Sequence, residues 1–182
     1  MPTFTRSVPK DPRGPAFQIF RTPTSREMVA IITSPDLVGC FTHFWKGRTV
    51  PCDAPDCEAC RDSIPYRWHA YQSAYNPNNG VHFLFECTAQ AAEHFTDYRD
   101  NHDTIRGCLF RARRMNAKAN GRIIIVCKPA DLTSIKLPQP PDLIKCLAIL
   151  WDFPVDDVAA ERLNPEKKTP HVKHTPKKEP TA

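Results

Sequence analysis

The sequence predicts a mainly β domain of the α+β class. Along most candidate strands apolar and polar residues alternate with a period of two, which is typical of sheets with one buried and one wet face. Residues 66–75 and 81–87 are two such runs, and the Asn-Pro-Asn-Asn-Gly between them favours a tight hairpin turn. One helical segment alone falls between strands, which argues against repeated βαβ units.

Length and composition are those of one ordinary domain with appendages. The chain has 182 residues, with 19 prolines against six glycines, and many of the prolines fall near the two ends. We therefore expect a flexible N-terminal arm at 1–25, a folded domain at 26–163 and a disordered basic tail at 164–182. The formal net charge is +5, of which the five lysines and two glutamates of residues 166–182 supply +3. Any nucleic-acid function must therefore depend on how charge is distributed within the domain.

The sequence also indicates where the protein acts. No apolar run reaches the roughly 20 residues that cross a bilayer, and the N-terminus lacks the apolar core of a signal peptide. We expect a cytoplasmic protein with no membrane partner. In that reducing compartment the eight cysteines are better explained by metal binding than by disulfides.

The first half of the folded domain is expected to hold four strands. Residues 28–33 are a short apolar run that ends at Ser-Pro-Asp, and residues 40–45 form the second strand. A long excursion with two prolines follows, before the hairpin of 66–75 and 81–87.

The second half is expected to alternate helix, strands and helix. Residues 88–99 are helical in composition with Thr88 as N-cap, and 107–115 and 122–128 are strands around a basic turn. A proline-punctuated linker at 132–141 leads to an apolar helix at 142–153 and a short helix at 155–163. A helix placed between hairpins of a β-rich unit is what closes one end of a five-stranded OB barrel. We therefore expect an OB-like five-stranded barrel with an inserted zinc knuckle and C-terminal helices.

The excursion after residue 45 carries the ligand types of a structural zinc site. Cys57 and Cys60 form a C-x-x-C chelate, Cys52 lies five positions before it, and His43 is the nearest upstream histidine. Three thiolates and an imidazole close a tetrahedral Zn²⁺ site, which would let a loop that buries little hold one shape. Cys40 and His69 are alternatives to His43 as the fourth ligand.

A basic and aromatic sheet face is the expected site of function. Rings interleaved with cations suit single-stranded nucleic acid, since bases stack on the rings and cations neutralise the phosphates. The candidate contact residues are Trp45, Lys46, Arg48, Arg67, Tyr71, Tyr75, Arg111 and Arg113.

A His-Cys-Cys-Cys zinc site at His43, Cys52, Cys57 and Cys60, inserted in such a barrel, resembles the phage T4-type helix-destabilising single-stranded-DNA-binding proteins. The resemblance implies largely sequence-independent coating of single-stranded DNA during DNA replication and recombination, together with replication or recombination proteins. The basic tail of this chain differs from the acidic tail with which that family recruits partners. RNA stays open as a ligand, because no residue pattern reports on a 2′-hydroxyl.

The sequence does not favour an enzyme. Zinc deaminases need H-x-E and P-C-x-x-C, whereas Trp45 stands where the glutamate would be and the cysteine after Cys52 comes five positions later. Four protein ligands would also leave the metal no open position for water. Asp97, Asp100 and Asp103 have a spacing that could suit a nuclease metal, but a solvated helix end explains them more simply. The alternative function is a zinc-ribbon protein-interaction module, or an accessory factor of a replication, recombination or transposition complex.

Overall fold

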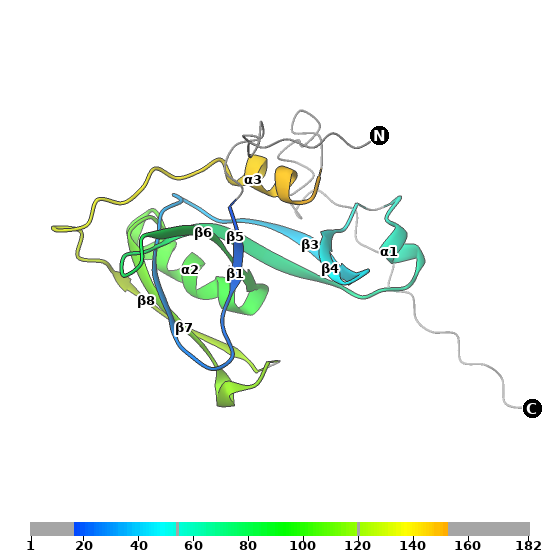
Figure 1. Ribbon diagram of the computed structural model, residues 1–182, viewed down its shortest axis with the longest axis horizontal. Coiled ribbons are helices and arrows are strands. Elements are labelled where there is room, and N and C mark those ends of the chain that lie inside the picture. The colour runs from blue at the N-terminus through cyan, green and yellow to red at the C-terminus, as the bar shows by residue number, and fades with distance from the viewer. Residues whose placement is uncertain (1–16, 54, 120, 153–182) are drawn as a thin grey trace, which may run out of the picture.

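The computed structural model describes residues 17–53, 55–119 and 121–152. Its strands form one mixed, open sheet, with a helix against each face (Figure 1). The strands are β1 (Ile19–Arg21), β2 (Met28–Ile32), β3 (Val38–Trp45), β4 (Arg48–Pro51), β5 (Tyr66–Asn76), β6 (Val81–Thr88), β7 (Cys108–Arg114) and β8 (Ile123–Pro129). The helices are α1 (Glu58–Arg61), α2 (Ala89–His102), the 3-10 turn η1 (Met115–Ala117) and α3 (Leu143–Leu150).

Strand β5, with eleven residues, is the centre of the sheet. One edge of β5 pairs with β6, from His69–Thr88 to Asn76–Val81, as the hairpin signal predicted. The other edge pairs with β3 along its first half and with β2 along its last residues. The sheet then runs from β2 to β7 and β8, while β4 extends it beyond β3.

The sheet differs from the expected five-stranded OB barrel. Eight strands form an open sheet in which, among the described residues, β1 pairs with β6 alone and β8 with β7 alone. Closure would need the outer strands to pair with each other. Alternation along a strand predicts which side chains are buried, but it does not report which strands are neighbours, and so it could not separate a barrel from an open sheet.

The main core lies between the sheet and α2. Phe85 and Phe110 stack with their ring centroids 4.8 Å apart, and Phe95 of α2 packs edge-on to Phe110 at 5.5 Å. On the opposite face α3 covers Tyr71 and Leu84. Asp142 is the N-cap of α3, and its carboxylate accepts the N–H of Lys145 at 3.0 Å.

The ends of the domain depart from the expected boundaries. Residues 19–21, which the sequence analysis placed in the flexible arm, form β1 and pair in parallel with Ile19 opposite Leu84 and Arg21 opposite Glu86. A three-residue strand is too short to leave a periodic signal. The rest of the arm before residue 17, the helix expected at 155–163 and the basic tail at 164–182 lie outside the described residues. Within the described ranges no helix has the length and apolar character needed to cross a membrane.

Gly39 on β3 is required by the indole of Trp68. A Cβ at Gly39 would overlap the six-membered ring of Trp68, which packs against the main core. We expect Gly39→Ala to lower the free energy of unfolding by about 1–3 kcal/mol, as overpacking does. Urea unfolding followed by tryptophan fluorescence measures this, with Trp68→Phe and the double variant completing the cycle. Additive single-variant effects would contradict a clash between these two residues.

Candidate metal centre and the adjoining arginine groove

Four potential metal ligands converge at the end of the sheet that carries β3 and β4. His43 lies on β3, Cys52 directly follows β4, Cys57 precedes α1 and Cys60 lies within it. Their ligand atoms all lie within 4.8 Å of one another. Cys60 Sγ is 3.6 Å from Cys52 Sγ and 3.4 Å from His43 Nε2. The structure therefore brings together the four residues that the spacing predicted.

These separations suit a tetrahedral metal site. With metal–sulfur bonds of about 2.3 Å and a metal–nitrogen bond of about 2.0 Å, tetrahedral ligand atoms lie roughly 3.5–3.8 Å apart. His43 Nδ1 lies 3.0 Å from the carbonyl oxygen of Ile64, which can only accept a hydrogen bond. The proton is therefore on Nδ1, which leaves the lone pair of Nε2, 3.4 Å from Cys60 Sγ, available to a metal, as outer-shell partners of metal-bound histidines arrange it.

The thiols of the cluster differ in acidity. Burial and the neighbouring Cys52 raise the pKa of Cys60 to about 12. Burial also opposes ionisation of Cys57, but backbone N–H groups of Cys60, Asp53 and Ala59 outweigh it and lower the pKa of Cys57. Three adjacent thiolates need a cation among them, so metal binding would release protons and its affinity would rise with pH.

The two alternative fourth ligands lie elsewhere. Cys40 is buried in the apolar cluster under α3. The His69 Nδ1 atom lies 2.6 Å from the hydroxyl of Thr42, on the sheet face that points away from the cluster. His43 is therefore the histidine that completes the site.

The β3–β4 hairpin connects the metal centre to a groove. Its turn is Lys46-Gly47, both with positive φ (49° and 78°), which is the tight connection that twisted hairpins favour. His43 is one of the four potential ligands and Trp45 packs against them, while the alternate residues Thr42 and Phe44 line the groove, which His43 also borders. A shift of this hairpin would therefore move both sites.

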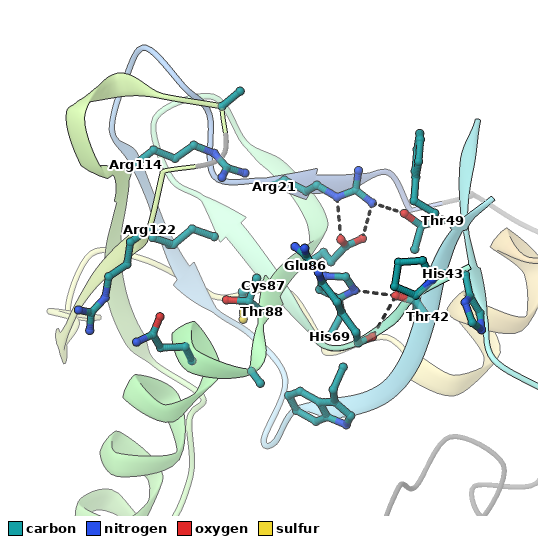
Figure 2. A pocket seen from close by; sticks show the side chains of 18 of the residues that line it. Arg21, Thr42, His43, Thr49, His69, Glu86, Cys87, Thr88, Arg114 and Arg122 are labelled. Atoms are coloured by element: carbon teal, nitrogen blue, oxygen red, sulfur yellow. Dashed lines mark hydrogen bonds and ion pairs between the residues drawn. The ribbon is translucent and has the colours of Figure 1, made fainter. Parts of the chain in front are cut away.

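The groove has a volume of about 1230 Å³ and lies between the hairpin and the β7–β8 turn. Figure 2 shows Arg114 and Arg122 on one side, Thr42 and Thr49 on the other, and Arg21 with Glu86 between them. The charged lining residues are Arg21, Arg67, Arg114, Arg122 and Glu86. Positive charge therefore exceeds negative charge along its walls.

The ion pair of Arg21 and Glu86 fixes the middle of the groove. Arg21 Nε and Nη2 donate to the two carboxylate oxygens of Glu86 at 2.7 and 2.8 Å, and Nη2 also donates to Thr49 Oγ1 at 2.8 Å (Figure 2). Glu86 is 4% exposed, and its hydrogen bond to Arg21 raises the pKa of that guanidinium. The carboxylate is thus neutralised locally, and β1 is attached to β4.

The other arginines keep their charge available. Arg114 donates to the carbonyl oxygens of Thr22 and Gly121, which are neutral partners. The Arg67 and Arg122 side chains are exposed and have no ion-pair or hydrogen-bond partner in the part of the chain that the structure describes. Burial lowers the pKa of His69, so the imidazole on the groove floor is neutral at pH 7.

The eight residues expected to contact nucleic acid do not form one surface. Arg67 lines the groove. Trp45 packs against Cys52 and Cys57 of the candidate metal site and its indole N–H donates to Asp62 at 3.1 Å, and Lys46 Nζ lies 3.7 Å from the Trp45 ring centroid. Arg48 is exposed opposite Trp45 on the hairpin. Tyr75, half-buried, Arg111 and Arg113 lie beyond the lining of the groove, and Arg111 pairs with Glu27 at 3.3 Å.

Tyr71 requires a correction. Its side chain is 0% exposed, and its ring packs edge-on against Trp151 with centroids 5.5 Å apart. Burial raises the pKa of its phenol. Because α3 covers this part of the face, the ring cannot stack on a base in this structure.

Sequence reasoning missed four residues of the groove. Phe44 lies at its wall and is 70% exposed. Alternation with Cys40 and Thr42 already placed Phe44 on one side of its strand, but the sequence pattern did not show that this side is exposed to solvent. Arg21, Arg114 and Arg122 come from segments far apart in the sequence, so only the fold brings them together.

Comparisons of the chain with protein-family models, with curated proteins and with solved structures gave no match.

Proposed function

We propose that the arginine groove binds single-stranded nucleic acid, with a structural Zn²⁺ holding the β3–β4 hairpin that forms one of its walls. The observation that carries this proposal is the lining of the groove: three arginines without a carboxylate partner among the described residues and one Arg21–Glu86 ion pair, with an exposed phenylalanine in the same lining. Single-stranded DNA is the ligand we favour, and RNA is compatible with the same contacts.

The charge of the groove supports a polyanionic ligand. Arg67, Arg114 and Arg122 have no carboxylate partner among the described residues, so each can neutralise a phosphate and release its counterions. The first residues of α2, Ala89 and Gln90, also line the groove, and the first turn of that helix has no acidic side chain. The positive end of the helix dipole adds to the attraction for anions.

Phe44 supports a ligand with flat, apolar rings. Phe44 is 70% exposed at the wall of the groove, so its ring is open to a ligand there. Stacking of a base on such a ring contributes about 1–3 kcal/mol and does not depend strongly on the base. Arg67 on β5 lies opposite Thr42 on β3, the strand that also carries Phe44. A phosphate contact at Arg67 and base stacking on Phe44 would therefore be neighbours.

Zinc fits the donor set of the metal centre. A buried His-Cys-Cys-Cys tetrahedron suits Zn²⁺ and leaves no coordination position for substrate, so we assign the metal a structural role. Strand β4 pairs with β3 alone among the described strands, and the metal ligands at His43 and Cys52 clamp both strands of the hairpin. A protein of this kind would serve replication or recombination by holding single strands.

Fluorescence anisotropy with labelled oligo-dT, oligo-U and a duplex of equal length tests the proposal. We expect either single strand to bind at least about tenfold more tightly than duplex, a difference of roughly 1.4 kcal/mol. Three phosphate contacts should give a slope of about −2 in log K against log salt concentration, at roughly 0.7 per contact. Equal affinity for single strand and duplex, or no binding to either, would exclude the proposed function.

A further inference from the structure

The β7–β8 hairpin, residues 107–130, concentrates the positive charge of the protein. It holds six lysines and arginines and no aspartate or glutamate, a net charge of +6, whereas the whole chain has a net charge of +5. The six are Arg111, Arg113, Arg114, Lys118, Arg122 and Lys128. Because like charges repel one another, a hairpin of this composition attracts a polyanion.

The turn of this hairpin, η1, places an exposed apolar side chain at the rim of the arginine groove. Met115 is 41% exposed. Arg114 before η1 and Ala119 after it both line the groove, so the turn borders it. Met115 N–H donates to the Arg122 carbonyl oxygen at 2.9 Å, and a Cβ at Gly121 would overlap the carbonyl oxygen of Met115. The backbone that carries the Met115 side chain is therefore closely packed.

Cations lie on both sides of this turn. Arg114 and Arg122 belong to the lining of the groove. Arg113 precedes Arg114 on β7, so strand alternation directs its side chain to the opposite face. Arg113 and Lys118 are exposed outside the groove lining, and their side chains have no partner among the residues that the structure describes. A single strand that follows the groove reaches the first two cations but not the second two.

We propose that the β7–β8 hairpin recognises a DNA fork, the junction at which a duplex separates into two single strands. This inference rests on the proposed function of the groove and specifies the form of its ligand. One strand lies in the groove against Arg114 and Arg122. The other strand passes the outer side of the hairpin, against Arg113 and Lys118. The last base pair of the duplex faces Met115.

The chemistry of Met115 suits the end of a duplex. A thioether carries no charge for a phosphate, whereas the open face of a terminal base pair is flat and apolar, and methionine is among the side chains that proteins insert at base steps. Its flexible side chain adapts to any base pair. Unpaired bases in the groove already have the ring of Phe44. The fork is therefore recognised by its shape and charge, without preference for sequence.

Fluorescence anisotropy with the full chain compares a labelled fork with two oligo-dT arms and an oligo-dT of the length of one arm. We expect the fork to bind at least about tenfold more tightly, since the duplex end adds a stacking contact and the second strand adds phosphate contacts. Met115→Ala should remove most of this preference and leave the affinity for oligo-dT unchanged. Arg113→Ala should weaken binding of the fork but not of a duplex with a single arm.

Leu132→Ala is the matched control for Met115→Ala. Leu132 is also 41% exposed and lies beside Gly107, at the other end of β7, so its replacement should change neither affinity. Equal affinity of the wild type for fork and oligo-dT would overturn fork recognition and leave single-strand binding by the groove intact. No binding to either DNA would overturn both proposals. A fork preference that the two alanine variants lower equally would exclude Met115 as the contact.

Discussion

Replacement of Cys60 by serine should abolish stoichiometric zinc binding and release the segment from Cys52 to Ile64. Cys60 Sγ lies 3.6 Å from Cys52 Sγ and 3.4 Å from His43 Nε2, so its loss removes a ligand that contacts two others. Structural zinc sites supply binding free energies of about 10–16 kcal/mol to the fold around them. Beneath the ligands lies only a small cluster of Phe41, Trp45, Ala59 and Ile64. Elemental analysis should therefore fall from one zinc per chain to none, and trypsin should cut at Arg61.

The rest of the sheet should survive this change. The main core of α2 with β5, β6 and β7 shares no residue with the cluster around the metal. Far-UV circular dichroism should thus change little, while affinity for oligo-dT should fall because the hairpin wall of the groove moves. Cys146→Ser is the matched control: it removes a half-buried thiol from α3, remote from the metal, and should keep full zinc content. Zinc retained by the Cys60 variant would exclude Cys60 as a ligand.

Lowering the pH should weaken zinc binding, as the Cys60→Ser substitution does. Burial and Cys52 raise the pKa of the Cys60 thiol to about 12 in the absence of metal, so zinc must displace a proton there at neutral pH. Falling pH favours that proton and lowers the apparent zinc affinity.

The convergence of the four potential metal ligands could be predicted because it depends on residues close together in the sequence. Cys52, Cys57 and Cys60 lie within nine consecutive residues, and His43 is brought to them by a hairpin with a two-residue turn. The β5–β6 hairpin was predictable for the same reason. A short connection fixes the register of the two strands, and the residue types of the turn, Asn-Pro-Asn-Asn-Gly, identify it from the sequence.

The groove could not be predicted because its information is long-range. Arg21 reaches Glu86 through the parallel pairing of β1 with β6, a contact between residues 65 positions apart. Tyr71 and Arg67 share one face of β5 by alternation, but α3 covers the former and leaves the latter in water. Periodicity assigns a face to each side chain; which part of that face another element covers is a property of tertiary packing.

Removal of charge from the groove should separate electrostatic from stacking contributions to binding. We expect Arg67→Ala with Arg122→Ala to lower affinity for oligo-dT strongly at low salt. The double variant should also reduce the slope of log K against log salt by about 1.4, at roughly 0.7 per phosphate contact. Both side chains are exposed and without described partners, so the fold should not change. Arg111→Ala with Arg113→Ala is the matched control on β7, outside the groove, and should have little effect.

Phe44→Ala should behave differently. Loss of a stacking platform costs about 1–3 kcal/mol, a factor of roughly 5 to 150 in affinity, at every salt concentration. The slope should stay that of the wild type, because no phosphate contact is removed. Phe44→Trp should restore affinity, since the larger ring stacks at least as well. The opposite result would be a loss of affinity and slope on replacing Arg111 and Arg113, with no effect of replacing Arg67, Arg122 or Phe44. The ligand would then lie on the open sheet face, and the groove would have no part in binding.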